Sequence, residues 1–418
     1  MKEMILQGQA QGLRAAVIEE GELMEVFEQE GPFSRLAGNI YLGRVENVLP
    51  GMQAAFVDIG LDKNAFLYVK DAVLPRFDEE DEGLAVSGAV TIQDILKPRQ
   101  QLLVQVIKEP LGNKGARITT NISLPGRYVV LLPQVPYVGV SRKIQDSKER
   151  ERLKAIVYEA CPDGMGIIIR TLAQGLQEQE IICNIEQLAQ IWNGIKKSLA
   201  RASVPGLVHQ DLDLAARLIR DFIDEDVEKI TLDQEEVAEI LRRSLQALNH
   251  PAGNHVLVVS HMDLFAERGI NDEIRKALLP KVWLKNGGYL IINETEALIV
   301  IDVNTGKYVG KYSLQETVLH TNLHAARMIA RQLRLRNLGG IIIIDFIDMV
   351  NDEDQQQVLK ALEEACESDK IKCNIVGLTR LGLVEITRKK VGQTLTARYT
   401  KRCNACSGSG RINLTNLN

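Results

Sequence analysis

Two aspartates stand where two apolar strands are expected to end. The stretch ALIVIDVNTG (297–306) runs five apolar residues into Asp302 and places Asn304 two positions later, and IIIID (341–345) ends on Asp345. Ligands of open α/β sheets gather where strands emerge, and neighbouring strands lie about 5 Å apart. Mg²⁺ suits such a pair because it takes one or two protein carboxylates and leaves its other positions to water and substrate phosphate. On adjacent strands, these two aspartates would therefore share one metal ion.

Asn304 has a supporting role in this interpretation. Two residues apart on an extended chain, its side chain points to the same side as that of Asp302. The amide would orient the carboxylate without adding charge. Asp348 is a third candidate ligand, or else the cap of a helix that starts near Asp352.

A structural interpretation of each aspartate competes with the metal site. Aspartate after a strand often stabilises a turn, and the segment DVNTG contains Asp, Asn and Gly, which are favoured in turns. Either aspartate alone favours the turn. The two together, beside an arginine-bearing segment at 323–336, favour the metal.

Length and composition bound the class of protein. The chain has 418 residues, which predicts two to four domains, and its 45% hydrophobic and 25% charged fractions are those of a soluble globular protein. We find no apolar run of membrane-spanning length, and the N-terminus breaks up its hydrophobic residues too quickly for a secretion signal. The default expectation is a cytoplasmic enzyme or binding protein.

The formal net charge of −5 argues mildly against a protein that coats nucleic acid nonspecifically, because such proteins are usually basic. The distribution of charge along the chain is more informative. Residues 97–127 and 370–402 each contain a single acid among several basic residues, and 323–336 carries four arginines and no acid. Three regions of one sign of charge are more than solvation of a surface requires, although each alone would be unremarkable.

The six cysteines do not form a disulfide framework in a chain of this length. Cys403 and Cys406 supply half of a tetrahedral zinc set, and Cys366 and Cys373 are candidates to complete it within one chain. His320 and His324 are one helical turn apart, but the glutamate of the protease motif does not follow His320. We interpret both histidines as ordinary helix residues.

The secondary structure changes character along the chain. The first 35 residues predict short strands with turns at Gly12 and Gly21, and about five strand-like runs within 38–125 predict a small closed β-barrel, interrupted by an exposed acidic loop at 77–83. Beyond the barrel, helices alternate with strands, which marks an α/β layer. The expected helices are 147–160, 178–200, 211–223, 233–247, 264–278 and 313–336, and the expected strands are 164–171, 227–231, 255–260, a meander over 281–302 turning at Asn286-Gly287 and Glu294, and 341–345.

Several long segments resemble those of the bacterial ribonuclease E/G family and occur in the same order. Their sequences are most similar to those of the G-type members. The segments are GNIYLGRVENVLPGMQAAFVDIG, GNKGARITTNISLPGRYVVLLP, IIIRT, IVIDVNTGKYVG, ARQLRLRNLGGIIIIDFIDM, GLVEITRKK and CNACSGSG. The resemblance covers essentially the whole chain. It implies a Mg²⁺-dependent endoribonuclease that hydrolyses single-stranded RNA, leaves 5′-phosphate and 3′-hydroxyl ends, is stimulated by a 5′-monophosphate, and serves rRNA and tRNA processing and mRNA decay.

The resemblance also assigns site residues. Asp302 and Asp345 match the metal-binding aspartates, and Asn304 matches the asparagine that supports them. The remaining matches are RNA contacts at Phe56, Phe66 and Lys114, and a 5′-phosphate pocket at Gly126, Val130, Arg170, Thr171 and Lys372. Lys372 stands where the family is expected to have an arginine. From periodicity alone, Phe56 is equally well a core residue.

The fold implied by the resemblance is multidomain α+β. An OB-fold RNA-binding domain of the S-one type (38–125) is inserted in an RNase H-like subdomain (1–37 and 215–279), with a 5′-monophosphate sensor region at 126–214. A DNase I-like catalytic domain (280–400) and a zinc-link (401–410) follow. In the zinc-link of the family, Cys403 and Cys406 of two chains would share one Zn²⁺, which implies a homodimer. Members of the family usually continue beyond Gly410 into a domain that pairs dimers, so the resemblance leaves both a dimer and a higher oligomer as alternatives.

Two other functions remain to be separated from the leading one. A catalytically silent RNA-binding protein on the same scaffold would have no reason to keep Asp302, Asn304 and Asp345 together. A Mg²⁺ phosphodiesterase acting on DNA is the other, and the OB-like region and phosphate pocket favour RNA over it.

Overall fold

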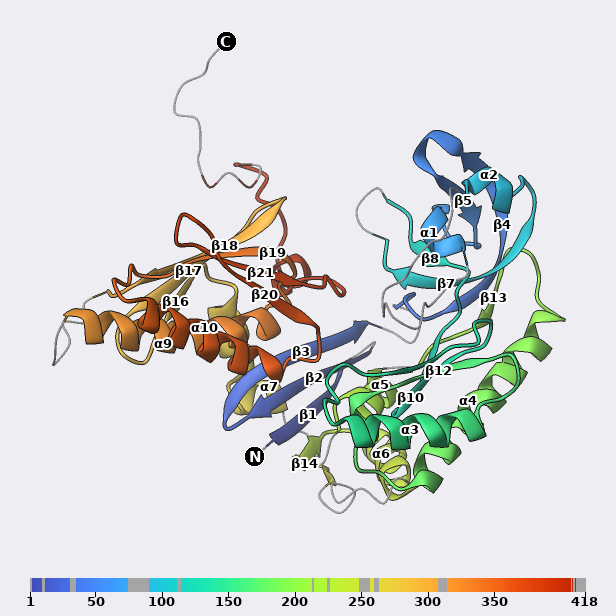
Figure 1. Cartoon of the computed structure of the whole chain (residues 1–418), viewed down its shortest axis with the longest axis horizontal. Helices are drawn as coiled ribbons and strands as arrows, with labels where there is room; N and C mark the ends of the chain where they lie inside the picture. Colours follow the sequence, from blue (N-terminus) through green and yellow to red (C-terminus); the bar gives the residue numbers. More distant parts are fainter. Residues whose placement is uncertain are drawn as a thin grey trace, which may run out of the picture.

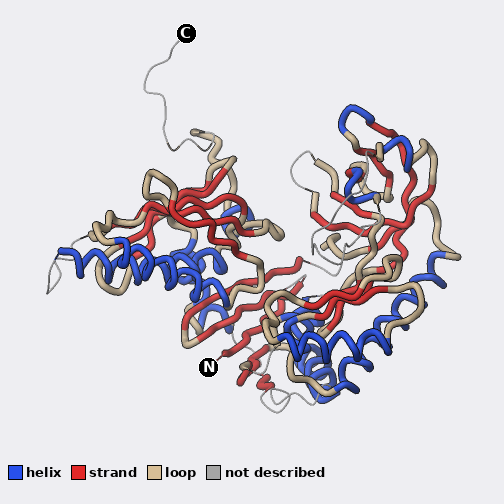
Figure 2. Tube along the Cα trace, in the orientation of Figure 1, coloured by secondary structure: helices blue, strands red, loops and turns tan. Residues whose placement is uncertain are grey.

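The computed structural model describes residues 2–9, 12–30, 35–73, 90–110, 114–212, 214–223, 226–247, 256–258, 263–306 and 314–406, together with Gly408 and Gly410. The acidic loop expected at 77–83 lies outside these ranges. The chain is a mixed α+β protein (Figures 1 and 2), in which a β-barrel and a six-stranded sheet lie toward opposite ends of the long axis. No helix in the described ranges is long and apolar enough to cross a membrane.

A five-stranded sheet lies between these two ends and joins the start of the chain to its middle. Its order is β15-β14-β1-β2-β3, with β1, β14 and β15 parallel and β1 to β3 antiparallel. The strands are β1 (Lys2–Gln9), β2 (Gly12–Glu19), β3 (Glu22–Glu30), β14 (Val227–Leu232) and β15 (Val256–Val258). The turn predicted at Gly21 is confirmed, since Glu20 and Gly21 both have positive φ. Gly12 begins β2, and the residues just before it are not described.

Helices cover both faces of this sheet, which explains why β1 is almost entirely buried. On one face α5 (Leu214–Asp221) and α6 (Glu235–Ala247) pack on the sheet. On the other lie α7 (Leu264–Glu267), α8 (Ile270–Ala277) and α11 (Leu395–Tyr399). The single helix expected at 264–278 is wrong, because Gly269 adopts a left-handed conformation (φ 66°) that separates α7 from α8.

The barrel predicted within 38–125 is confirmed as a closed ring of five strands. β4 pairs with both β5 and β7, which closes the order β4-β5-β6-β8-β7, and β13 (Gly206–His209) pairs with the first residues of β4. The other elements are β4 (Ile40–Leu49), β5 (Ala54–Asp58), β6 (Ala65–Tyr68), β7 (Gln101–Lys108), β8 (Arg117–Thr119), and the short helices α1 (Val69–Ala72) and α2 (Ile92–Ile95).

A four-stranded sheet of order β11-β12-β10-β9 follows the barrel and packs against two helices. The strands are β9 (Leu124–Pro125), β10 (Val129–Leu132), β11 (Val138–Val140) and β12 (Gly166–Ile169), and the helices are α3 (Ser147–Ala160) and α4 (Glu178–Leu199). Both helices begin and end close to their predicted positions.

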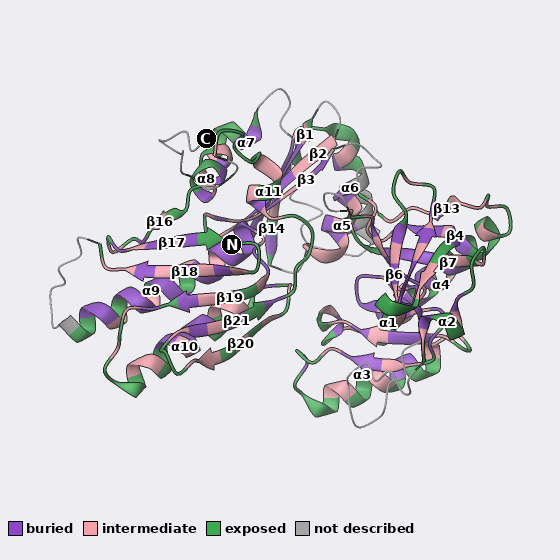
Figure 3. Cartoon of the chain, turned by 90° about the horizontal axis from the view of Figure 1, so that it is seen from above, coloured by how far each residue is buried: buried purple, intermediate pink, exposed green. Residues whose placement is uncertain are grey.

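The C-terminal body is a six-stranded sheet of order β16-β17-β18-β19-β21-β20 with two helices on one face (Figure 1). The strands alternate between buried and more exposed residues (Figure 3), so the second face of this sheet is open. The elements are β16 (Lys281–Trp283), β17 (Tyr289–Glu294), β18 (Leu298–Asn304), α9 (Leu314–Leu335), β19 (Gly340–Asp345), α10 (Asp352–Glu367), β20 (Cys373–Leu378) and β21 (Val384–Arg388). The meander with its turn at Asn286-Gly287 is confirmed.

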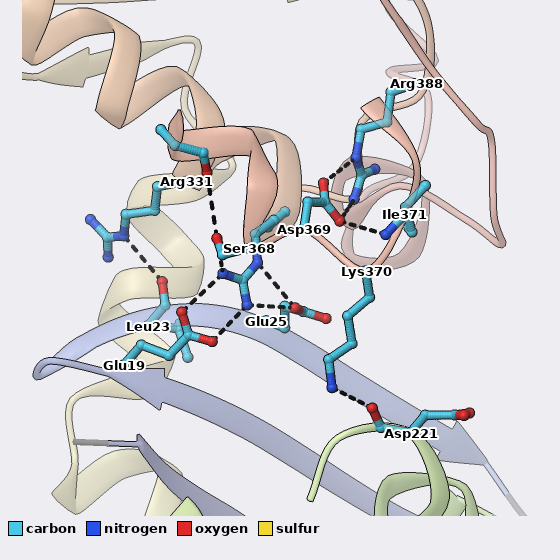
Figure 4. Close-up of polar contacts among 12 residues, drawn as sticks. Glu19, Leu23, Glu25, Asp221, Arg331, Ser368, Asp369, Lys370, Ile371 and Arg388 are labelled. Carbon is cyan, nitrogen blue, oxygen red and sulfur yellow. Dashed lines mark hydrogen bonds and ion pairs between the residues drawn. The ribbon is translucent and has the colours of Figure 1, made fainter. Parts of the chain in front are cut away.

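The arginines of α9 join this body to the β1–β3 sheet. Arg334, only 3% exposed, lies 2.8 Å from carboxylate oxygens of both Glu19 and Glu25, and Arg331 donates to the carbonyl of Leu23 (Figure 4). Arg331 also pairs with Glu22 and Glu273. Nearby, Ser368 accepts a hydrogen bond from Arg334. Arg331 and Arg334 therefore hold two parts of the fold together, and Arg336 is buried, so Arg327 is the one exposed arginine of 323–336. This corrects the use of the whole segment as a basic stretch that supports a metal or nucleic-acid site.

Candidate active site

Asp302 and Asp345 lie side by side on the open face of the C-terminal sheet. β18 and β19 run parallel, and their register makes these two residues direct partners. The residues on either side of Asp302, Ile301 and Val303, are buried against the helices, so alternation directs Asp302 to the opposite face. Asp345 is exposed and Asp302 is half-buried. The two carboxylates predicted to converge are thus brought together by the sheet itself.

Asn304 contacts Asp302 as expected. Its Nδ2 donates a hydrogen bond of 2.8 Å to Oδ2 of Asp302, and both residues belong to β18. One oxygen of Asp302 is therefore held in place by the amide. The other oxygen keeps its lone pairs for another ligand.

The donor set at this point suits an ion that needs few protein ligands. Within the described ranges, no group of three or more His, Cys, Asp or Glu side chains converges. Asp348 is exposed and does not complete such a group, and it does not cap α10 either, because the residue at that cap is Asn351. Two carboxylates without nitrogen or sulfur ligands match the preference of Mg²⁺, which retains several waters.

Phe56 and Phe66 form an aromatic pair on the outside of the barrel. They are register partners on β5 and β6, with ring centroids 6.0 Å apart at an interplanar angle of 69°. Their neighbours Ala55, Val57, Ala65 and Leu67 fill the barrel core, whereas both phenylalanines are half-buried. The interpretation of Phe56 as a core residue is therefore wrong.

Lys114 lies beside the start of β6, the strand that carries Phe66. The backbone N–H of Phe66 donates to the carbonyl of Ala116 at 2.7 Å, and a Cβ at Gly115 would meet the carbonyl oxygen of Asn64 at 2.0 Å. Only glycine allows this close approach, which fixes the exposed Lys114 beside the start of β6.

The residues matched to the phosphate pocket gather at one end of the four-stranded sheet. Arg170 follows β12, and its Nη1 donates to the carbonyl of Gly126. Thr171 shares a hydrogen bond of 2.9 Å with the hydroxyl of Ser141. Val130 pairs with Ile168 across β10 and β12. A half-buried guanidinium, a hydroxyl and an apolar wall thus lie together, which is suitable for a terminal phosphate.

Asp221 is the ion-pair partner of Arg170, and sequence reasoning missed it. Its carboxylate lies 2.9 Å from Nη2 of Arg170 and 2.7 Å from Nη2 of Arg220. Burial alone would raise the pKa of Asp221, but the two guanidiniums outweigh burial and hold the pKa below its ordinary value. Asp221 lies at the end of α5, about fifty residues from Arg170 in sequence, so no local pattern signals their contact.

The loop that carries Lys372 reaches Asp221 from the C-terminal body. Lys370 donates to the carbonyl of Asp221 (Figure 4), and Lys143 donates to the carbonyls of Glu367 and Asp369 at 3.3 and 3.1 Å. Lys372 itself is exposed. Asp369, at the base of this loop, pairs with the buried Arg388 of β21 at 2.7 Å.

The four C-terminal cysteines fall into two separate pairs. Cys366 and Cys373 are half-buried within the C-terminal body, where their mutual hydrogen bond, together with burial, raises the pKa of Cys366, and the same hydrogen bond lowers the pKa of Cys373. Cys403 is exposed, and backbone N–H groups of Gly410 and Gly408 lower the pKa of Cys406. Each pair therefore contains one cysteine whose pKa is lowered, and the thiolate is the form of cysteine that binds a metal ion.

A closed five-stranded barrel with surface aromatics, joined to a sheet with paired carboxylates, is typical of enzymes that process nucleic acids. The model of the ribonuclease E/G family matches residues 123–391. Ribonuclease G of Escherichia coli (strain K12) is 42% identical over 411 residues, which cover 96% of this chain and 82% of that protein. Ribonuclease G of Haemophilus influenzae is 42% identical over 403 residues, with the same two coverages. Ribonuclease E of Nostoc sp. is 43% identical over 404 residues, covering 95% of this chain and 57% of that protein. The chain therefore belongs to the ribonuclease E/G family.

Proposed function

We propose that the chain is a Mg²⁺-dependent endoribonuclease that cleaves single-stranded RNA and leaves 5′-phosphate and 3′-hydroxyl ends. Family membership makes it an endoribonuclease of the E/G type. The observation that carries the metal assignment is the register pairing of Asp302 with Asp345 on the open face of the sheet. The same family suggests work in rRNA and tRNA processing and in mRNA decay.

The residues of the site have distinct tasks in this reaction. Asp302 and Asp345 would hold the ion, and Asn304 keeps the carboxylate of Asp302 in one orientation. When bound, Mg²⁺ supplies an activated water and neutralises charge that develops on the phosphate. The strands beneath the aspartates are buried and hydrogen-bonded, so both carboxylates keep their places as an RNA strand enters.

The barrel would bind the unpaired RNA. Phe56 and Phe66 offer ring faces for base stacking, and Lys114 adds positive charge beside them. Stacking accepts any base because every base has a flat aromatic face. This arrangement suits an enzyme that selects unpaired RNA over one strict sequence.

The pocket of Gly126, Val130, Arg170 and Thr171 would hold a 5′-terminal monophosphate, with Lys372 contributing charge from the adjacent loop. Arg170 is already oriented by Gly126 and Asp221, so less conformational entropy is lost when it binds an anion. A pocket fixed in this way favours a compact phosphate over a bulkier triphosphate.

The finer architecture is also a proposal. The order β15-β14-β1-β2-β3 supports an RNase H-like subdomain formed by 1–37 and 215–279 around an OB-fold of the S-one type, and the C-terminal sheet supports a DNase I-like catalytic domain over 280–400. Cys403 and Cys406 would bind one Zn²⁺ shared with a second chain. In the described part of the chain Cys366 and Cys373 do not join Cys403 and Cys406 in a group of three or more such ligands, which supports a set completed by a second chain.

The test is cleavage of a 5′-monophosphorylated single-stranded RNA by the wild type, Asp302→Asn and Asp345→Asn, with Mg²⁺ and with a chelator. We expect cleavage only by the wild type in Mg²⁺, with RNA binding retained by both variants. Full activity in either variant would overturn the metal assignment. Equal binding without cleavage by the wild type would favour the silent RNA-binding protein, and equal cleavage of single-stranded DNA would favour the phosphodiesterase.

A further inference from the structure

The edge of the catalytic sheet next to the paired aspartates carries an exposed aromatic cluster. We propose that Lys281, Trp283 and Tyr289 form a subsite, here called the β16–β17 subsite, that stacks an unpaired nucleobase of the RNA beside the phosphodiester to be cleaved. This inference rests on the proposed function of Asp302 and Asp345.

Strand register places the cluster on the same face as the aspartates. Trp283 pairs with Tyr289, and Tyr289 pairs with Asn304. One row along the sheet, Lys281 pairs with Ile291, which pairs with Asp302. Directly paired residues project to the same face, so Lys281, Trp283 and Tyr289 share the open face with Asp302 and Asn304.

The distances are short on the scale of an RNA strand. Adjacent strands lie about 5 Å apart, so β16 is about 10 Å from β18 across the sheet. A short run of unpaired nucleotides spans that interval. A base seated on β16 therefore belongs to the RNA segment whose backbone passes the aspartates.

The side chains of the cluster are built for stacking. Trp283 is 62% exposed, whereas Leu290 on the opposite face of the sheet is fully buried. The rings of Trp283 and Tyr289 meet edge to face with centroids 5.5 Å apart. Lys281 places its ammonium 4.0 Å from the centroid of Trp283 and 3.7 Å from that of Tyr289. The ammonium holds the two rings in position and adds positive charge on the path of the RNA backbone.

An unpaired nucleotide fits both the exposed aromatic rings and the positive charge of the β16–β17 subsite. Exposed tryptophan is a frequent stacking platform for single-stranded nucleic acid, and a neighbouring lysine attracts the phosphates on either side of the base. The other edge of the sheet presents Val376, 60% exposed on β20, which is neither aromatic nor charged. That residue offers a matched control on the same sheet.

The first test measures cleavage of RNAs in which one base at a time is removed near the cleavage position. For the wild type, removal of the base that occupies the subsite should lower kcat/KM about 5-fold to 100-fold, the usual effect of losing one stacked base. Trp283→Ala should show that loss on intact RNA and no further loss at that one position, and Val376→Ala should behave as the wild type. If Trp283→Ala responds to every base removal as the wild type does, the subsite is wrong.

A second test measures the fluorescence emission of Trp283. The chain has two tryptophans, and Trp192 is 7% exposed within α4, so Trp192→Phe leaves Trp283 as the emitter. In a Trp192→Phe, Asp302→Asn protein, single-stranded RNA should quench this emission at the concentrations at which a labelled RNA becomes bound, and the same RNA without the stacked base should not. Unchanged emission at saturation would overturn the proposal. Cleavage by Asp302→Asn would instead contradict the proposed function, so the two failures are distinct.

Discussion

Asp302 and Asp345 are direct register partners on the parallel strands β18 and β19. Their separation is therefore set by backbone hydrogen bonds of the sheet, and Ile301 and Ile344, both fully buried, anchor the strands just before each aspartate. A pair mounted in this way loses little entropy on binding an ion, because neither backbone segment has to be ordered first.

Asn304→Ala should lower cleavage about 10-fold to 100-fold and raise the Mg²⁺ concentration needed for half-maximal activity, with RNA affinity unchanged. The amide holds Oδ2 of Asp302 at 2.8 Å, and loss of such an orienting group typically costs that factor. A Mg²⁺ titration of the cleavage rate measures the effect. Asn293→Ala on β17, an exposed asparagine that pairs with Val300, is the matched control and should be silent. Equal titrations for Asn304→Ala and the wild type would remove the orienting role.

Arg170→Gln should reduce the preference for a 5′-monophosphate over a 5′-hydroxyl by about 10-fold or more, since a charge-assisted hydrogen bond to phosphate contributes about 1.5–3 kcal/mol. Cleavage of the 5′-hydroxyl RNA should stay unchanged. The measurement is the ratio of kcat/KM for the two RNAs. Arg152→Gln, which breaks the surface pair with Glu149 on α3, serves as control. A preference that survives in Arg170→Gln would place the phosphate elsewhere.

Asp221→Asn should destabilise the protein in a pH-dependent way. The folded pKa of Asp221 lies below its ordinary value, so its ion pairs add stability above that ordinary value, about 3.9, and lose it as the pH falls through the folded pKa. The thermal midpoint of the variant should therefore be lower than that of the wild type at pH 7, with the difference shrinking at pH 3. Asp62→Asn, in an exposed loop, is the control. A difference that is the same at both pH values would show that the carboxylate's charge is not what stabilises the fold.

Sequence patterns predicted the parts of the fold that depend on local periodicity. The β18 and β19 strands, their terminal aspartates and the turn at Asn286-Gly287 follow from apolar runs and turn chemistry that lie within a few residues. The barrel was predictable for the same reason. The break between α7 and α8 was missed, because a single glycine inside a helical pattern is usually tolerated and here adopts φ 66°.

Contacts between distant segments were not predictable from the sequence. Asp221 meets Arg170 only after α5 packs on the first sheet, and Arg331 and Arg334 of α9 pair with glutamates of β2, β3 and α8. In the sequence alone, these arginines resemble a basic surface. The difference lies in tertiary packing, which charge counts along the chain do not contain.

Arg334→Met should destabilise the joint between the C-terminal body and the β1–β3 sheet by about 3 kcal/mol, the lower end of the cost of leaving a buried ion pair without one partner. The ionised carboxylate of Glu25 would lose the most stabilisation, because burial raises its pKa and Arg334 is the residue that most opposes this effect. Calorimetry should show a lower first unfolding transition. Arg275→Met, which breaks an exposed pair with Asp272, should shift stability by only about 0–1 kcal/mol. Equal effects of the two substitutions would mean that Arg334 does not hold the joint.

Cys403→Ser should abolish stoichiometric zinc and convert the dimer to a monomer, because a chain with one remaining thiolate cannot hold its share of a four-thiolate site. Zinc content by metal analysis and mass by light scattering measure the two effects together. Cys366→Ser is the matched control: Cys366 contacts Cys373 in the core of the C-terminal body, so its substitution should leave both zinc content and mass unchanged. Zinc lost from Cys366→Ser as well would assign the ion to a set within one chain. A zinc-loaded dimer that persists in Cys403→Ser would contradict the shared site outright.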